Sequence, residues 1–490
     1  MVGRWRAMSV IAVTYSSFVN RDFVTTVLTG DSVLWYNMCM NFFERKVYSQ
    51  LLSWKDKLAG KYALLVEGAR RVGKTSVIRR FIEAEYENYI YIDFSSKEKK
   101  IRDVRKAFQS YADIGDLLLR LQLIFEVRLV EGRSCVVFDE VQLFPTAREA
   151  IKHLVEYGKY HYIESGSLVG IKENVKDILI PSEEHKLKMY PMDFEEYLLA
   201  TGRGMLLEHI QDCFKKHVAL AKEVHDQAMD MFRSYLVVGG MPQSVEAYID
   251  TETEKRFDAS ETAKREILSL YEDDIGKYAH GYAAKVRDIF KTIPSALRRH
   301  EKTFHLADID VNARMRRYEN AFLWLDDAMV VNTAYNATSP DLGIAMSEDH
   351  SSFKCYYADT GLLITAAMGR TVDPRVLRGV LHDNLGIDEG MFFENVVAQT
   401  FASKGEDLRF YSCKNREDES ATMEVDFLLS RGIKICPVEV KSGKYRAHAS
   451  LDRMIAKYGR HLGRKFVICT GGYEESADVT YLPAYMAHLI

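Results

Sequence analysis

Eight consecutive residues have the types and the spacing that hold a chain of phosphate groups. They are Gly68, Ala69, Arg70, Arg71, Val72, Gly73, Lys74 and Thr75, and Ser76 follows them. In the pattern GxxxxGK(S/T), backbone N–H groups surround the phosphate oxygens, the lysine reaches the β- and γ-phosphates, and the hydroxyl ligates Mg²⁺. The pattern predicts that these residues bind a nucleoside triphosphate, with Thr75 as a magnesium ligand and Lys74 active in hydrolysis.

Two acids follow a second apolar segment, residues 133–138. At the end of a buried strand, Asp139 is placed to hold Mg²⁺ through water and Glu140 to polarise the attacking water. The competing interpretation is a surface turn after a core strand. Further on, Ser165 or Ser167 is expected beside the γ-phosphate as a polar sensor, unless these serines only end a strand.

Charged residues also recur in a predicted hairpin near the C-terminal end of the sequence. Residues 424–429 and 435–441 have the patterns of two strands joined by a turn. Because side chains alternate on a strand, Glu439 and Lys441 share a face, and the hairpin brings Asp426 beside them.

A helix predicted at 390–399 adds Glu394 to this group. The order of these residues is that of PD-(D/E)xK nucleases, in which carboxylates hold Mg²⁺ or Mn²⁺ and a lysine orients the attacking water. We expect Asp426 and Glu439 as metal ligands, and all of Glu394, Asp426, Glu439 and Lys441 in catalysis. Two alternatives stay open: charged residues on the wet face of a sheet, or a fold kept for binding after catalysis is lost.

The elements that must position the first site alternate in type. Apolar segments that end in glycine or acids are expected to be parallel strands, and amphipathic segments between them helices. The strands are predicted at 62–66, 89–94, 133–138 and 160–167, and helices at 44–60 and 76–82.

The middle of the chain is predicted to be mainly helical, from the segment at 188–198 to about residue 330. A turn is expected at 239–242. Helices at 285–298, 306–310 and 312–327, followed by strands at 328–332 and 354–357, predict a winged helix. Its arginines form a basic patch that would meet DNA phosphates, although exposed arginines are usually a solvated face; they are Arg298, Arg299, Arg314, Arg316 and Arg317.

Length and composition place these patterns in a large globular protein. The 490 residues exceed what one hydrophobic core serves. We expect an N-terminal extension at 1–41, an ATPase domain at 42–200, a helical and winged-helix-like region at 201–385 and a nuclease-like α/β domain at 386–490.

The charge and the cysteines limit the possible environments. A formal net charge of −4 disfavours a wholly basic nucleic-acid-binding surface. Seven scattered cysteines without a CxxC pair favour reduced thiols. The sequence has no apolar run of the roughly 20 residues that a membrane helix needs. We therefore expect a cytoplasmic protein that does not enter a membrane.

Over residues 42–490 the chain resembles prokaryotic AAA-type ATP-binding proteins that carry a C-terminal domain of unknown function with a nuclease-like fold. The resemblance depends on short phrases in order: GARRVGKT (68–75), FDEVQ (138–142), SGS (165–167), MYPMDFEEY (189–197), GGMP (239–242), YADTGLL (357–363), FEN (393–395), EVDF (424–427) and VEVKS (438–442). It implies ATP as the nucleotide, Mg²⁺ at Thr75 and Asp139, hydrolysis aided by Glu140, and Gln142 as a sensor of the γ-phosphate. The segment 182–186 departs from the family pattern.

Two functions are consistent with this fold class, a P-loop NTPase sheet followed by a helical region and a nuclease-like α/β domain. In the first, an ATP-hydrolysing protein binds or cleaves DNA under nucleotide control. In the second, the nucleotide sets a regulatory switch, and a catalytically dead C-terminal domain binds a partner protein. A homo-oligomer is compatible with both.

Overall fold

The computed structural model describes residues 43–167, 182–279, 281–299, 303–305, 309, 315–341, 343–369, 389–414, 422–443, 447–476 and 478–490. They all belong to the structural unit Phe42–Ile490. The predicted N-terminal extension lies outside the described residues. So does the predicted short helix at 306–310, apart from Ile309, which is in a turn.

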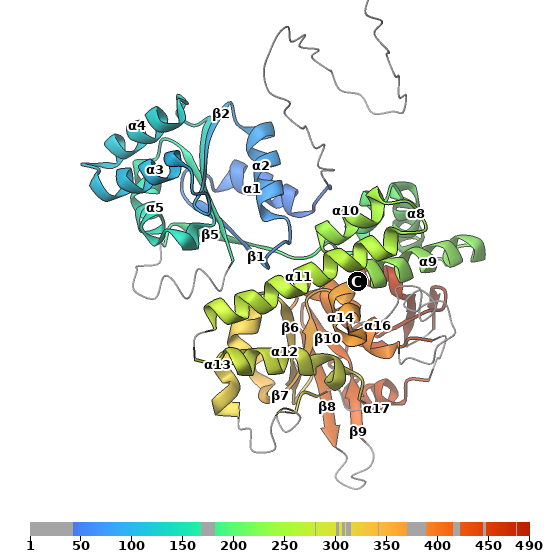
Figure 1. The fold of residues 1–490 in the computed structure, drawn as a ribbon. Helices are drawn as coiled ribbons and strands as arrows, with labels where there is room; N and C mark the ends of the chain where they lie inside the picture. Colours follow the sequence, from blue (N-terminus) through green and yellow to red (C-terminus); the bar gives the residue numbers. More distant parts are fainter. Residues whose placement is uncertain are drawn as a thin grey trace, which may run out of the picture. The chain divides into compact units, whose positions relative to one another are not determined.

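A parallel sheet forms the first part of the described chain (Figure 1), with the strand order β2-β3-β4-β1-β5. Its strands are β1 (Ala63–Gly68), β2 (Asn88–Asp93), β3 (Ser134–Asp139), β4 (His161–Gly166) and β5 (Glu184–Met189). The accompanying helices are α1 (Val47–Lys57), α2 (Lys74–Glu85), α3 (Lys99–Ser110), α4 (Ile114–Phe125), α5 (Pro145–Tyr157) and the short η1 (Val141–Leu143). The predicted α/β sheet is therefore confirmed.

Alternation along the strands explains why this sheet is covered on both faces. Leu64 and Val66 of β1 pack in one apolar cluster with residues of α1 and α2. Their neighbours Ala63 and Leu65 pack in another cluster, with residues of α3, α4 and α5. Because both faces are buried, β1 reads as a continuous apolar run, as strands of parallel sheets do.

The sequence-based interpretation missed β5. The segment 188–198 was expected to open a helical stretch, but Lys188 and Met189 end β5, which pairs in parallel with β1, and the next helix begins at Phe194. In β5 only Leu187 and Met189 are buried. An edge strand of this kind is mostly polar, so its apolar pattern is weak.

Helices follow the sheet: α7 (Phe194–Ala200), α8 (Gly204–Lys215), α9 (Lys222–Val238), α10 (Pro242–Asp250) and α11 (Arg256–Tyr278). The predicted turn at 239–242 separates α9 from α10. Pro242 is the first residue of α10, where its missing N–H leaves no helical hydrogen bond unmade.

The winged-helix interpretation is not confirmed, although most of its elements are present. They are α12 (Ala283–Leu297), α13 (Met315–Asp327), β6 (Val331–Ala337) and β7 (Glu348–Tyr357), with η3 (Ile344–Ser347) before β7. The two strands pair antiparallel, as predicted. However, β6 also pairs in parallel with β8 (Arg409–Lys414), so the hairpin belongs to a larger sheet with the order β7-β6-β8-β9.

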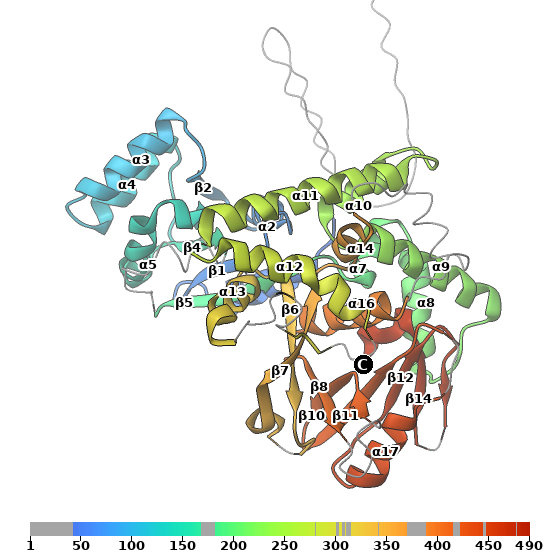
Figure 2. The same cartoon turned by 60° about the horizontal axis from the view of Figure 1, so that its bottom comes forward.

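The last part of the chain holds a second mixed sheet with the order β10-β11-β12-β14-β13 (Figure 2). The elements are α14 (Thr360–Met368), α16 (Gly390–Ser403), β9 (Thr422–Val425), β10 (Phe427–Arg431), β11 (Lys434–Val440), α17 (Ala449–Tyr458), β12 (Phe466–Cys469), β13 (Glu474–Glu475), β14 (Thr480–Pro483) and η4 (Ala484–Leu489). The predicted hairpin is confirmed, because β10 and β11 pair antiparallel. The predicted strand 424–429 is broken at Asp426, which separates β9 from β10.

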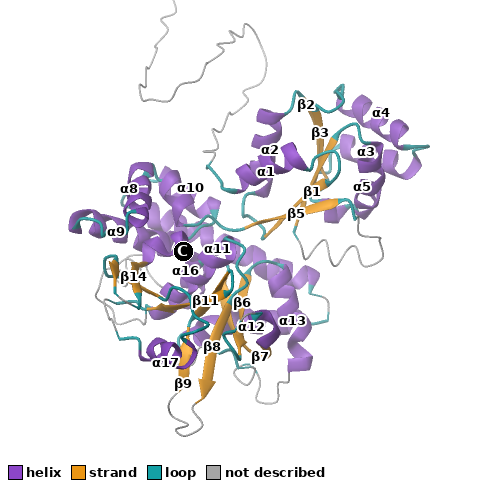
Figure 3. Cartoon of the chain, turned by 180° about the vertical axis from the view of Figure 1, so that it is seen from behind, coloured by secondary structure: helices purple, strands orange, loops and turns teal. Residues whose placement is uncertain are grey.

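Helix α16 lies inside this region, among helices and orange strands in Figure 3. Every residue from Met391 to Ala402 is buried, as expected for a helix that is covered on all sides. Phe427 and Leu429 of β10 pack in the same apolar cluster as α16, whereas Leu428 packs with Met454 of α17. The two helices therefore cover opposite faces of the sheet.

Candidate functional site

The phosphate-binding loop connects β1 to α2 as the sequence predicts. Gly73 precedes α2 with φ of 99°, and Arg71 has φ of 68°. A Cβ atom on Gly68 would lie 2.5 Å from the carbonyl oxygen of Met189 in β5. Glycine is therefore required at Gly68 by the neighbouring strand and favoured at Gly73 by the left-handed turn.

Lys74 is buried at the start of α2. Its ammonium donates hydrogen bonds to the carbonyl oxygens of Gly68 (2.8 Å) and Ala69 (3.0 Å) in its own loop. Burial lowers the pKa of Lys74, and the nearby Glu140 and Asp139 raise it. The donors of Lys74 thus bond to carbonyl oxygens of the loop that is expected to hold the phosphates.

The Asp139 carboxylate accepts hydrogen bonds from the hydroxyl groups that surround the expected magnesium position. Thr75 Oγ1 donates to Asp139 Oδ2 at 3.0 Å. Ser165 donates to Oδ1, and Tyr91 donates to Oδ2. The structure therefore brings Thr75, Asp139 and Ser165 together, as predicted. Tyr91, at the end of β2, was missed, although the adjacent parallel strand makes its position foreseeable.

Glu140 and Gln142 are joined at the edge of this group. Gln142 Nε2 donates to Glu140 Oε2 at 2.5 Å. Burial raises the pKa of Glu140, while Lys74 lowers it. Glu140 has φ of 53°, which is uncommon for a residue with a side chain. Backbone strain of this kind is frequent at functional sites.

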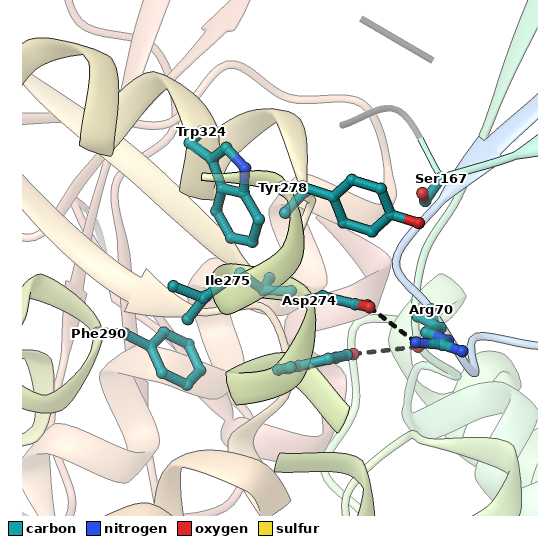
Figure 4. Close-up of a pocket in the computed structure, with 10 residues that line it drawn as sticks. Arg70, Ser167, Asp274, Ile275, Tyr278, Phe290 and Trp324 are labelled. Atoms are coloured by element: carbon teal, nitrogen blue, oxygen red, sulfur yellow. Dashed lines mark hydrogen bonds and ion pairs between the residues drawn. The ribbon is translucent and has the colours of Figure 1, made fainter. Parts of the chain in front are cut away.

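The phosphate-binding loop also contacts helix α11 (Figure 4). Arg70 Nη1 lies 2.7 Å from Asp274 Oδ1, and the Tyr271 hydroxyl donates to the carbonyl oxygen of Arg70 at 3.2 Å. Ser167 lines the same small pocket, next to Tyr278. Of the two predicted sensor serines, Ser165 contacts Asp139 and Ser167 faces α11.

Arg45 links the loop to the segment after β5. Its guanidinium donates to the carbonyl oxygens of Val72 (3.0 Å) and Tyr190 (2.7 Å), and Nε lies 3.2 Å from Glu196. The arginine is 8% exposed. Sequence reasoning missed it, because no local pattern connects residue 45 with residue 72 or 190.

Three of the recognised phrases meet at one crossing of the chain. Met192 N donates to the carbonyl oxygen of Gly240 at 2.7 Å, and Gly240 N donates to Asp359 Oδ2 at 2.5 Å. A Cβ atom on Gly240 would lie 2.0 Å from Met192 O, and one on Gly361 2.6 Å from the Cα of Gly239. These glycines permit close backbone contact, which explains why glycine stands at these positions of the sequence.

Two of the predicted C-terminal residues, Glu394 and Asp426, lie beside a lysine that sequence reasoning did not consider. Lys354 Nζ in β7 lies 2.6 Å from Glu424 Oε1, 3.0 Å from Glu394 Oε1 and 3.6 Å from Asp426 Oδ1. Tyr356 also donates to Glu394 Oε1. The signal in the sequence is a lysine inside the apolar and aromatic second half of β7, residues 353–357.

Glu439 and Lys441 form a separate pair beside this cluster. Lys441 Nζ donates to Glu439 Oε1 at 2.7 Å, and Val440 N donates to Asp426 Oδ2 at 2.8 Å. Burial and the neighbouring Asp426 raise the pKa of Glu439 to about 7, and Lys441 lowers it. Across the described part of the chain, no three Asp, Glu, His or Cys side chains converge as metal ligands would.

The predicted basic patch is described only in part. Arg298 and Arg317 are exposed, and Arg299 is half-buried. Arg314 and the side chain of Arg316 lie outside the described residues. Within the described helices, none is long and apolar enough to cross a membrane.

Comparison with protein families gives three matches. Residues 60–198 match a family described as "AAA domain", residues 229–373 a "Domain of unknown function (DUF8612)" and residues 389–486 a "Domain of unknown function (DUF4143)". The chain thus carries an AAA-type P-loop ATPase domain. The last description names no activity, so the nuclease-like character of the C-terminal region remains a prediction.

Three solved structures align with the chain at low identity. They are the Walker-type ATPase PABY2304 of Pyrococcus abyssi (15% identity, 66% of this chain and 96% of that chain, TM-score 0.41), Drosophila ORC bound to DNA (12%, 70% and 96%, 0.29) and Cdc6p from Pyrobaculum aerophilum (10%, 70% and 96%, 0.21). TM-scores below 0.5 do not establish a shared fold. The comparison with curated proteins finds no significant match.

Proposed function

We propose that this protein is an ATP-binding, Mg²⁺-dependent ATPase that works as a switch, in which the bound nucleotide sets the position of helix α11. The observation that carries the proposal is the direct contact between the phosphate-binding loop and α11. Arg70 pairs with Asp274, and Tyr271 donates to the backbone of Arg70. Because phosphates bind to the backbone and side chains of this same loop, their binding and release act on those contacts.

The residues around Asp139 fit a magnesium ion. The Thr75 hydroxyl and the Asp139 carboxylate offer oxygen ligands at one place, which suits a small hard cation. When bound there with ATP, Mg²⁺ neutralises charge on the phosphate oxygens. Lys74 exchanges its two loop carbonyls for the β- and γ-phosphate oxygens.

Glu140 is the residue we assign to the attacking water. Its raised pKa makes it a better proton acceptor than an ordinary carboxylate, and Gln142 holds one of its oxygens. We assign to Ser165, which donates to Asp139, the role of distinguishing a filled γ-phosphate position from a vacated one. ATP is expected over GTP from the family resemblance alone.

Two substitutions test the ATPase. Lys74→Ala removes the cation that meets the phosphates and should abolish ATP binding and turnover. Glu140→Gln should retain binding and slow hydrolysis by about 10²–10⁴-fold, the usual contribution of a general base. Lys57→Ala and Glu83→Gln, on exposed positions of α1 and α2, are the matched controls. Normal turnover in Lys74→Ala would refute the assignment.

The switch is tested separately, by hydrogen exchange of backbone amides in the Glu140→Gln protein. Exchange in the second half of α11, residues 271–278, should differ between the ATP-bound and ADP-bound states. Helix α4 (Ile114–Phe125), which packs against α3, α5 and β2, serves as the internal control. Equal exchange in α11 with both nucleotides would exclude this route of control.

Cleavage or binding of DNA by the C-terminal region is the second candidate function. The observation in its favour is the confirmed β10–β11 hairpin, which places Asp426, Glu439 and Lys441 at one end of the strands. We propose testing it on labelled single-stranded, duplex and branched DNA with Mg²⁺ or Mn²⁺, with and without ATP. Cutting that disappears in Glu439→Ala would establish it, and no cutting with normal ATP turnover favours the switch with a protein partner.

A further inference from the structure

Three carboxylates of the C-terminal region already surround the positively charged side chain of a lysine. Lys354 is fully buried, and its Nζ lies within 3.0 Å of oxygens of both Glu394 and Glu424, with Asp426 at 3.6 Å. These acids come from three different elements, α16, β9 and the break before β10. One ammonium group is therefore the common centre of three carboxylates.

The Lys354 ammonium and a divalent cation cannot occupy this centre together, because both are positively charged and both need the same space. Mg²⁺ requires oxygen ligands at about 2.0–2.1 Å and commonly takes one or two carboxylates. The nitrogen of Lys354 fills the space between the oxygens of Glu394, Glu424 and Asp426. A divalent ion placed there would strongly repel the buried ammonium, because the medium has a low dielectric constant.

Lys354 is also fixed from the backbone side. In β7 it pairs with Ala334 of β6. Tyr357, three residues on, donates from its N–H to Asn395 Oδ1 at 2.9 Å and accepts from Asn395 Nδ2 at 3.1 Å. Its hydroxyl donates to the carbonyl oxygen of Phe290 in α12 at 3.1 Å. The strand that carries the lysine is thus held by α16 on one side and by α12 on the other.

We propose that the Lys354 ammonium takes the place of a divalent cation at this carboxylate cluster, so that Glu394, Glu424 and Asp426 do not form a metal-dependent hydrolytic site. The inference is independent of ATP hydrolysis, and it deepens the switch function by arguing against metal-dependent cleavage at this cluster. It also assigns Glu394, Glu424 and Asp426 to neutralising the lysine, so they are not predicted to contact a substrate.

Binding of Mn²⁺ to the full-length, nucleotide-free chain tests the proposal, with free Mn²⁺ measured by electron paramagnetic resonance. All proteins carry Asp139→Asn, which removes the magnesium ligand of the ATPase site. With Lys354 in place, we expect Asp426→Asn to leave Mn²⁺ binding unchanged. With Lys354→Ala, the freed carboxylates should bind one Mn²⁺ per chain, and adding Asp426→Asn should remove it.

Lys264→Ala is the matched control. Lys264 is equally buried, but it forms its ion pair with one carboxylate, that of Glu261, at 2.9 Å. Removing this lysine should create no Mn²⁺ site. A site in Lys264→Ala as strong as that in Lys354→Ala would overturn the proposal, because any buried lysine would then give the same effect.

The proposal stays testable if Lys354→Ala does not fold. In that case the comparison of Asp139→Asn with Asp139→Asn/Asp426→Asn decides alone. Mn²⁺ binding that requires Asp426 while Lys354 is present would refute the proposal, and its absence supports it. Because no ATP is present, failure here leaves the ATPase assignment untouched, and a failed ATPase test leaves this result interpretable.

Discussion

Gly240→Ala is expected to be among the most destabilising single-methyl substitutions in the chain. The added Cβ would lie 2.0 Å from Met192 O and 2.9 Å from both Met192 N and C. All three are backbone atoms, so no side-chain rotation relieves the contact. The segment after β5 and the turn between α9 and α10 must separate instead.

The magnitude follows from what that separation breaks. Overpacking in a tight interior costs about 1–3 kcal/mol. Separation also lengthens the hydrogen bond from Met192 N to Gly240 O and the one from Gly240 N to the buried carboxylate of Asp359; a bond to a charged group contributes about 1.5–3 kcal/mol. We expect a loss of about 3–6 kcal/mol in the free energy of unfolding.

Urea denaturation followed by circular dichroism measures this loss, with Gly204→Ala as the control. Gly204 is the first residue of α8, and the nearest atom to an added Cβ is 3.8 Å away, on the flexible side chain of Leu199. Alanine there should change stability by about 1 kcal/mol or less, in the stabilising direction. If Gly240→Ala behaved like Gly204→Ala, the close crossing at Met192 would be refuted.

Two further experiments probe a buried and an exposed ion pair. Arg148 lies within 3.0 Å of both Glu164 and Glu184, and all three side chains are at most 1% exposed. Arg148→Met leaves two buried acids without their cation, so the free energy of unfolding measured with urea should fall by about 3–5 kcal/mol, and a loss below about 1 kcal/mol would contradict this burial. The Arg70–Asp274 pair has a half-exposed arginine, so a double-mutant cycle with alanine should give a coupling of about 0.2–1 kcal/mol in the nucleotide-free protein. The same coupling with a bound ATP analogue would argue against the proposed switch.

The sequence was sufficient to predict those elements whose local pattern and site residues lie on one stretch of the chain. The loop from Gly68 to Thr75, the strand ending at Asp139 and the hairpin around Gly432 all follow from apolar runs and turn residues. Asp139 and Thr75 meet because carboxyl ends of parallel strands share one edge of the sheet. Such positions follow from the class of sheet.

Other features depend on pairings that no local pattern encodes. Lys354 reaches Glu424 only because β7 pairs with β6, β6 with β8 and β8 with β9. β5 was missed because its exposed residues His185, Lys186 and Lys188 give it the composition of a loop. In both cases the missing information is the order of strands in a sheet.

The pairing of β6 with β8 has a consequence for how this architecture is inherited. Residues 331–337 supply a strand to the sheet that residues 409–425 continue, and one apolar cluster includes residues of both regions. A recombination event that exchanged only residues 386–490 would leave β8 with an unpaired edge and would uncover α16, and exposed edges of this kind promote aggregation. The segment from α12 through β14 is therefore expected to pass between genes as one module, even where its two family matches suggest two.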